Sequence, residues 1–305
     1  DGYYEISNAA QLKWFTDEVN AGKSTLNARL TNDIDLSSVC DETTPWTPIG
    51  DHANNRIYSG TFDGQGHKIT GLYLKGNASN YTNGNTYYIG LFGECDGVTI
   101  KNLSVYGTAM AVTRMVGGLA GRTCGVSTHR RSTVENCHNY VTLTGSATND
   151  DIFSHGGLVG SAQETDFIGC SNEVDITGYQ GQVGGIVGNT GIGGVTLTNC
   201  WNSGHVHLRG YKSTFEGVGG LVGSGSGGAV VTGFLHSGSG NSLGNSFLIC
   251  IDDGSIRADL AQQGLSHSNA LELVAVLVQH LVHLVVLCTV HQMGGLHDQV
   301  LHAVG

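Results

Sequence analysis

The sequence predicts an all-β fold, a parallel β-helix (solenoid) that begins with a short capping helix, because three short sequence blocks recur in a fixed order. The first block is an apolar pair bracketed by glycines, and it occurs five times at steps of 28, 39, 28 and 35 residues. The second block leads into a cysteine or a leucine, and the third alternates apolar with polar residues and ends in glycine. The first block occupies 90–93, 118–121, 157–160, 185–188 and 220–223, the second 100–103, 134–137, 167–170 and 197–200, and the third 141–145, 174–178 and 206–210.

Each repeat unit therefore holds three short segments of strand character, separated by glycine or asparagine corners. A unit this small cannot bury its own apolar face, so it must stack on its neighbours. Stacking gives a parallel β-helix of either hand, with neighbouring rungs about 4.8 Å apart. About seven rungs would form a rod roughly 30 to 35 Å long on that spacing.

Several residue types fall at equivalent places in successive units, which predicts columns of like side chains. Asparagines at these places can hydrogen-bond along a ladder, and the cysteines are expected to form a buried stack of thiols. A disulfide between two neighbouring cysteines of the stack remains an alternative at rung spacing. The double glycines that open the first block are expected where a corner needs a positive φ or a close backbone approach. The columns are Asn136 and Asn199; Asn139, Asn172 and Asn202; and Cys137, Cys170 and Cys200.

The residues before the first repeat predict a short helix that closes the first rung. Asn8 is a suitable N-cap, Leu12, Phe15 and Val19 share one helical face, and Gly22 can end the segment. A solenoid end without such a cap would expose strand edges and core to water.

The composition excludes several classes of protein. With 48 glycines but no strict triplet period, 2 prolines and 13% charged residues, the chain is neither collagen-like nor a charged or Pro-rich disordered chain. A formal net charge of -11 with only 14 Lys and Arg argues against nucleic-acid binding, which depends on clustered cations. We expect no cofactor and no metal, because no Cys-x-x-Cys pair occurs and His205 and His207 lack an assignable third ligand.

Particular segments carry a family resemblance. The chain resembles secreted bacterial proteins that carry the GLUG motif, and the resemblance covers about residues 1–225, with the repeats at about 88–223. It implies a β-helical protein that is exported and extracellular or on the cell surface; some members are described as adhesins or as IgA-peptidase-like. The motifs mark scaffold, so the resemblance implies little about catalysis. The segments that carry it are 4–6 with 11–12, 33–36, 46–50, 60–69 and the five glycine-bracketed repeats.

Residues 226–305 depart from the repeat pattern. They open with a Gly/Ser-rich linker and continue as an apolar, His-rich segment without Lys or Arg after Arg257. From Val274 to Val285 the apolar residues would share one face of a helix, which could cap the solenoid or make an oligomer contact. Polar residues such as Glu272 and His280 inside the apolar stretch argue against a membrane anchor. A segment read in a shifted frame is the third alternative.

The corner after the third strand is the predicted binding edge, because equivalent loops of successive units carry aromatic and acidic residues. Aromatic rings stack on the apolar faces of sugars, and carboxylates accept hydrogen bonds from sugar hydroxyls. The ligand-binding candidates are Tyr179, Tyr211 and Lys212. If the edge were catalytic, Asp150 or Asp151 would pair with Glu216 as acid and base for glycoside cleavage.

The sequence therefore predicts a secreted or cell-surface solenoid whose role is adhesion or glycan binding. A glycan or a host surface molecule is the expected partner. A polysaccharide-degrading hydrolase or lyase acting along a solenoid face, and a purely structural stalk, are the alternatives.

Overall fold

The computed structural model describes residues 2–52, 54–76, 88–111, 115–125, 127, 129–145, 154–179, 181–209, 217–225, 229–232 and 235–236. Within these ranges the chain is mostly β-strand, with parallel sheets and a single α-helix. The predicted apolar, His-rich C-terminal segment lies beyond His236, outside the described residues. Its helical, membrane-anchor and shifted-frame alternatives therefore stay open.

Three sheets make up the described structure, and none of them is closed. The long sheet has 15 strands, and each of the two short sheets has five. Along the long sheet, the main path is β1 (Tyr3–Ile6), β2 (Asn27–Leu30), β4 (Thr61–Asp63), β8 (Thr99–Ala111), β11 (Ser132–Gly145), β14 (Thr165–Ile168), β19 (Val195–Thr198) and β24 (Ala229–Thr232). Its other strands are β3 (Ile34–Asp35), β5 (Lys68–Lys75), β15 (Ser171–Asn172), β16 (Ile176–Gly178), β20 (Trp201–Asn202), β21 (Val206–Leu208) and β25 (Leu235–His236).

The strands of the first short sheet end directly before the glycine-bracketed blocks, and those of the second begin at the third residue of each block. The first short sheet contains β6 (Tyr88–Ile89), β9 (Met115–Gly117), β12 (Ser154–Gly156), β17 (Gln182–Gly184) and β22 (Gly217–Gly219). The second short sheet contains β7 (Phe92–Asp96), β10 (Ala120–Cys124), β13 (Val159–Ala162), β18 (Val187–Thr190) and β23 (Val222–Gly225).

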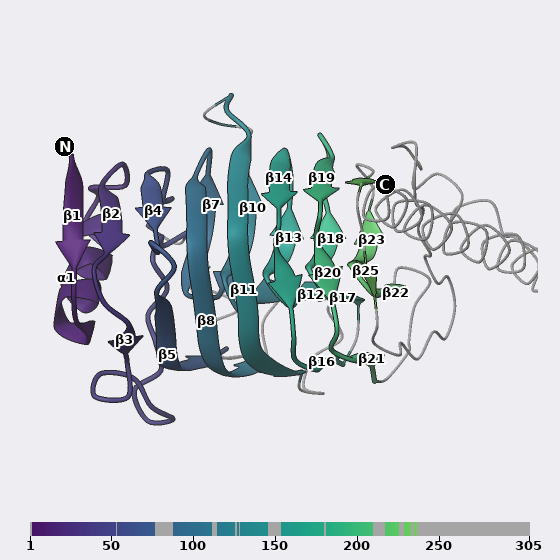
Figure 1. Cartoon of the computed structure of the whole chain (residues 1–305), viewed down its shortest axis with the longest axis horizontal. Helices are drawn as coiled ribbons and strands as arrows, with labels where there is room; N and C mark the ends of the chain where they lie inside the picture. Colours follow the sequence, from purple (N-terminus) through teal and green to yellow (C-terminus); the bar gives the residue numbers. More distant parts are fainter. Residues whose placement is uncertain are drawn as a thin grey trace, which may run out of the picture. The chain divides into compact units, whose positions relative to one another are not determined.

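Each repeat unit pairs in parallel with the unit before it and the unit after it. In the second short sheet, Ala120 lies opposite Phe92 on one side and opposite Val159 on the other. The main path of the long sheet likewise visits the units in chain order, and its strands lie side by side in Figure 1. The units differ in length because the segments between their strands differ in length. Equivalent residues of successive units still pair with each other.

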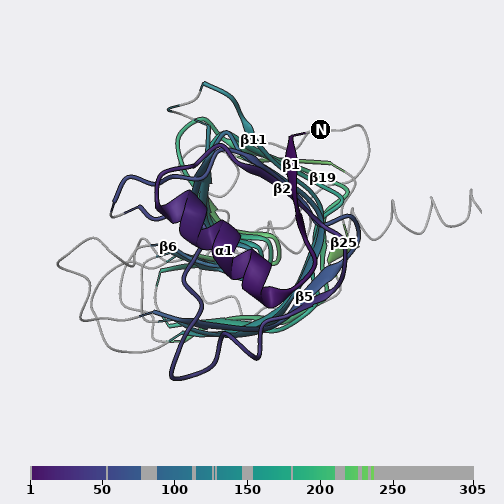
Figure 2. The same cartoon turned by 90° about the vertical axis from the view of Figure 1, so that its left-hand side faces the viewer.

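A helix lies at the N-terminal end of the sheets. Figure 2, which views the molecule from this end, shows α1 (Ala9–Asn20) in front of the strands. The side chain of Asn8 accepts a hydrogen bond from the Gln11 backbone N–H at 3.0 Å, which confirms the predicted N-cap. On its buried face, Phe15 packs edge-on against Tyr58 and Phe62, with ring centroids 6.0 Å apart in both pairs. The helix thus covers the apolar interior at the N-terminal end of the sheets.

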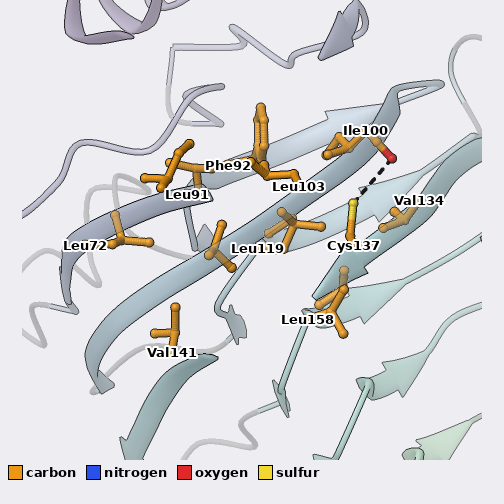
Figure 3. Close-up of a cluster of buried hydrophobic side chains, with 14 of the residues drawn as sticks. Leu72, Leu91, Phe92, Ile100, Leu103, Leu119, Val134, Cys137, Val141 and Leu158 are labelled. Carbon is orange, nitrogen blue, oxygen red and sulfur yellow. Dashed lines mark hydrogen bonds between the residues drawn. The ribbon is translucent and has the colours of Figure 1, made fainter. Parts of the chain in front are cut away.

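The core is a continuous apolar cluster that runs from the helix through the repeats. Figure 3 shows part of it, where the Cys137 thiol donates a hydrogen bond to the Ile100 carbonyl at 3.7 Å. The Cys170 thiol donates in the same way to the Val134 carbonyl of the preceding unit at 3.3 Å, and its pKa is influenced by Cys137 and Cys200 on either side, which confirms the predicted column of thiols. All three thiols are free and buried, and burial is the main cause of the raised pKa of Cys170.

A second buried column consists of asparagine side chains. The amide of Asn139 donates to the Asn172 side-chain oxygen at 2.8 Å, and the amide of Asn172 donates to that of Asn202 at 2.7 Å. Each amide also donates to the backbone carbonyl two residues further along its own chain. This confirms the predicted ladder and satisfies polar groups that are completely shielded from water.

The double glycines are required because other atoms lie very close to them, and not because the backbone needs a positive φ. None of the four glycine pairs has a positive φ, although the sequence left that reason open. A Cβ atom on Gly118 would lie 1.9 Å from the Asn139 side-chain oxygen, and one on Gly157 would lie 2.0 Å from the Gly185 carbonyl oxygen. The turn between the two short sheets therefore packs its backbone directly against the asparagine ladder and the next unit.

The corner before each cysteine of the thiol column requires a left-handed backbone. Asn136 and Asn199 have φ values of 49° and 54°, and Gly169 takes the equivalent place with φ 62°. Asparagine and glycine tolerate this conformation better than other residues, so Gly169 is a natural replacement for the missing asparagine. The Asn136 amide donates to Asn102 of the preceding unit at 3.3 Å and not to Asn199.

We expect Asn136→Gly to change the free energy of unfolding by less than about 0.5 kcal/mol, because the side chain is exposed and glycine keeps the positive φ. Asn136→Val should cost about 1 to 2 kcal/mol, because a β-branched residue is strained there. Urea denaturation of the two variants would test the corner. Equal stabilities of the two variants would show that the left-handed backbone at position 136 does not restrict which residue is tolerated there.

Candidate functional site

The predicted binding edge is only partly within the described residues. Tyr179 directly follows β16 and is half-buried. The remaining candidates, Asp150, Asp151, Tyr211, Lys212 and Glu216, lie outside the described residues. The predicted acid and base pair therefore stays a prediction.

The long sheet nevertheless combines aromatic and acidic side chains on its outer face. From Cys137 onward strand β11 alternates, with Cys137, Asn139, Val141 and Leu143 buried and the residues between them half-buried or exposed. The same alternation continues in the strands paired with it, so a regular outer surface is formed.

Two tyrosines on this outer face stack on each other. Tyr106 and Tyr140 lie opposite each other in β8 and β11, with ring centroids 4.3 Å apart and an interplanar angle of 5°. On the other side of Tyr106, the pairing of β5 with β8 is irregular, and Thr70 and Gly71 stand opposite this one residue. On this side, one of the two residues opposite Tyr106 is therefore Gly71, which has no side chain.

A carboxylate fixes the hydroxyl end of the stack. The Tyr140 hydroxyl donates to Glu173 Oε1 at 2.6 Å, and Ser171 Oγ donates to the same oxygen at 3.1 Å. His138 Nδ1 lies 2.7 Å from Ser171 Oγ. We refer to Tyr106, His138, Tyr140, Ser171 and Glu173 as the outer-face cluster.

The environment keeps Tyr140 protonated. Burial raises the pKa of Tyr140, and the hydrogen bond to the negative charge of Glu173 raises it further. Within the described part of the chain, Glu173 Oε2 accepts no hydrogen bond, while Oε1 accepts two. The cluster therefore offers a tyrosine hydroxyl of fixed position and a carboxylate oxygen that can accept a hydrogen bond from a ligand.

Serine, histidine and glutamate lie together in the outer-face cluster, but not in the order of a nucleophilic triad. In a hydrolytic triad, histidine lies between the nucleophile and the carboxylate. Here Ser171 lies between His138 and Glu173, and its side chain is 0% exposed. This arrangement orients side chains and does not activate a nucleophile.

A second polar cluster joins the first repeat units. Glu94 is only 2% exposed, and its carboxylate accepts a hydrogen bond from Arg122 at 2.6 Å and contacts His52. The guanidinium of Arg122 also hydrogen-bonds Gln163 and lies 5.8 Å from the centroid of the Tyr88 ring. A buried carboxylate must be compensated in this way, so the contacts account for the cluster as a tie between neighbouring units.

No motif signalled either polar cluster, although the repeats held a clue to the second. Glu94 and Arg122 each follow the second glycine of a glycine-bracketed block, so they are equivalent residues of opposite charge in consecutive units. In the outer-face cluster the tyrosine recurs only at Tyr106 and Tyr140, and Glu173 takes the equivalent place in the next unit.

The two histidines considered as metal ligands lie at β21. His205 and His207 have ring centroids 5.9 Å apart. Among the described residues, there is no group of three or more His, Cys, Asp or Glu side chains placed to hold a metal ion.

Comparison with known proteins gives two similarities. The chain is 37% identical over 128 residues to "Putative Gly-rich membrane protein" of Evansella cellulosilytica, a match that covers 40% of this chain and 13% of that protein. A crystal structure described as "a putative immunoglobulin A1 protease" from Bacteroides ovatus has a TM-score of 0.51 and 17% identity, over 83% of this chain and 80% of the other. No family model matches the sequence.

One comparison shows a similarity in fold, and the other shows a similarity in sequence to a small part of one relative. At 17% identity, the structural similarity concerns the arrangement of the strands alone. The chain covers far less than two thirds of the Gly-rich protein. In the described residues, no helix combines the length and the apolar character needed to span a bilayer.

Proposed function

We propose that this chain is an extracellular or cell-surface β-solenoid, of the type that the GLUG resemblance implies, and that it binds glycans through the outer face of its long sheet. Three features support this: the parallel pairing of successive units, the partial similarity to a protein named as a membrane protein, and the similarity in fold to a structure described as "a putative immunoglobulin A1 protease".

The observation that carries the proposal is the outer-face cluster. Sugars are recognised by aromatic rings and by oxygen atoms of fixed position, and both are combined around Tyr140 and Glu173. Short side chains follow on the same outer face, at Thr142 and Thr144, and leave room above the sheet. Since rungs repeat about every 4.8 Å, a polysaccharide lying along the sheet axis would meet a new row of side chains at intervals close to one pyranose residue.

The binding proposal can be tested by removing the two polar groups separately. We expect Glu173→Gln to weaken glycan binding about tenfold, because a charged acceptor contributes about 1.5 kcal/mol or more to a hydrogen bond. Tyr140→Phe should have a smaller effect, because it keeps the ring stack. The double variant Tyr106→Ala and Tyr140→Ala should abolish binding. A panel of polysaccharides tested by affinity electrophoresis, followed by calorimetry with the best binder, would provide the measurements.

Thr142→Ala is the matched control, because Thr142 is exposed on the same strand but outside the cluster. Unchanged affinity in the Glu173 and double variants would contradict the proposal. The same panel should be assayed for reducing ends and unsaturated products, because their release would indicate a polysaccharide-degrading enzyme. If neither binding nor turnover is observed, the structural stalk is favoured.

A further inference from the structure

An exposed pair of aromatic side chains lies on the N-terminal cap, away from the outer-face cluster in sequence. Tyr4 and Trp14 are 43% and 46% exposed, and their ring centroids are 5.5 Å apart at an interplanar angle of 54°. They come from β1 and α1, which lie at the same end of the described structure in Figures 1 and 2. The two rings thus contact each other and still expose much of their surface to water.

The exposure of Trp14 is not required by the fold of the helix. The face of α1 that covers the core is made by Leu12, Phe15 and Val19, all fully buried, and Trp14 is not one of its buried residues. Elsewhere in the described chain, Trp46 is 7% exposed and Trp201 is half-buried. A tryptophan left this open points to contact with something other than the core.

The surroundings of the pair are charged. One helical turn after Trp14, Glu18 pairs with Lys23. The pKa of Lys23 is raised, mainly by its hydrogen bond and charge interaction with Glu18. Two further ion pairs stand nearby in sequence, Lys13 with Asp17 at 2.9 Å and Glu5 with Arg29 at 2.6 Å.

This combination suits a sugar better than a protein partner. Stable protein interfaces bury about 800 Å² on each side, around a core depleted of charged residues. Two aromatic rings bordered by ion pairs do not provide such a core. A pyranose needs less: an aromatic surface for its C–H face, and donors and acceptors at the rim for its hydroxyls. Exposed ion pairs contribute little to stability, so their groups are available for this purpose.

We propose that Tyr4 and Trp14, with Glu18 and Lys23 at their rim, form a second carbohydrate-binding site that takes β-linked glucose or N-acetylglucosamine units. In these sugars the ring substituents are equatorial, so both ring faces present flat C–H surfaces to an aromatic side chain. Glu18 accepts from a ligand hydroxyl, and Lys23 donates to another. The site is separate from the outer-face cluster and does not depend on the proposed function of that cluster.

The test uses the complete chain with cellohexaose and N-acetylchitohexaose as probes. Because Trp14 is the most exposed of the three tryptophans, it should dominate quenching of the intrinsic fluorescence by acrylamide. We expect at least one of the two probes to protect the tryptophan fluorescence from quenching by acrylamide. By calorimetry, which does not need the tryptophan signal, Trp14→Ala should weaken the binding of a probe about tenfold or more, and Trp14→Phe should keep part of the affinity. Tyr4→Ala should weaken binding in the same direction.

Ile192→Ala is the matched control, because Ile192 is an apolar side chain that is 79% exposed but belongs to neither α1 nor β1. Circular dichroism and thermal unfolding of the Trp14 and Tyr4 variants verify that α1 remains folded. Binding of neither probe, or binding that survives both alanine substitutions, would overturn the proposal. The Glu173→Gln variant separates the two sites: if the cap site exists, this variant keeps the Trp14 response whether or not the outer face binds glycans.

Discussion

Alanine at Gly157 is expected to destabilise the protein by about 3 kcal/mol or more, because its methyl group would have to overlap backbone and ladder atoms. The added Cβ would lie 2.0 Å from the Gly185 carbonyl oxygen and 2.6 Å from two atoms of the Asn172 side-chain amide. Neither neighbour is the free end of a flexible side chain, so relief requires that two repeat units move apart. Urea or thermal denaturation followed by circular dichroism measures the effect.

Gly66→Ala is the appropriate control for this prediction. Gly66 has φ 82°, but no heavy atom lies within 4 Å of the position that a Cβ would take. The control should therefore lose only the roughly 1 to 2 kcal/mol that an L-residue pays in a left-handed conformation. If Gly157→Ala is no less stable than Gly66→Ala, the close approach of the units is not what selects glycine.

Alanine at Asn172 is expected to lower the free energy of unfolding by about 3 kcal/mol, because Asn172 is the middle member of the asparagine ladder. The substitution removes the acceptor of the Asn139 amide, the donor to Asn202 and the donor to the Val174 carbonyl. Each buried group that loses a partner costs about 1 kcal/mol or more, and a small cavity adds to the loss. For a domain of this size, such a change would lower the melting temperature by about 10 °C.

The corner variant Asn136→Gly provides the comparison, because it also removes an asparagine but at an exposed place. A melting temperature for Asn172→Ala within about 2 °C of that control would show that the ladder contributes little to stability. Asn172→Asp should be destabilised as well, since a carboxylate cannot donate to the Asn202 oxygen.

The inward-facing part of the structure could be predicted from the sequence, because it depends on residues that repeat. Cys137, Cys170 and Cys200, and likewise the three asparagines of the ladder, occupy one place in three units, so their alignment follows from stacking. The helix was predictable for a different reason, because Asn8 and the apolar face are local signals.

The outward-facing chemistry could not be predicted in the same way. Tyr106, Tyr140 and Glu173 meet because three units place them side by side, yet nothing in the periodicity distinguishes an outer tyrosine from any other exposed residue. The Tyr4 and Trp14 pair depends on how α1 packs against β1, which no repeat describes. For the glycines, the sequence predicted the positions but left the reason open, since only the folded structure shows which backbone atoms lie against them.

The parallel register of successive units also bears on how the chain reaches its native state. Nearly every inter-strand contact joins residues about one unit apart, as between Asn172 and Asn202, which are 30 residues apart. The sequence separation of the contacts therefore stays constant as further units are added, and the loop that must close for each unit is of similar length. Such a chain can assemble progressively, with α1 and the first strands as a template formed early, so its folding time need not increase steeply with the number of units.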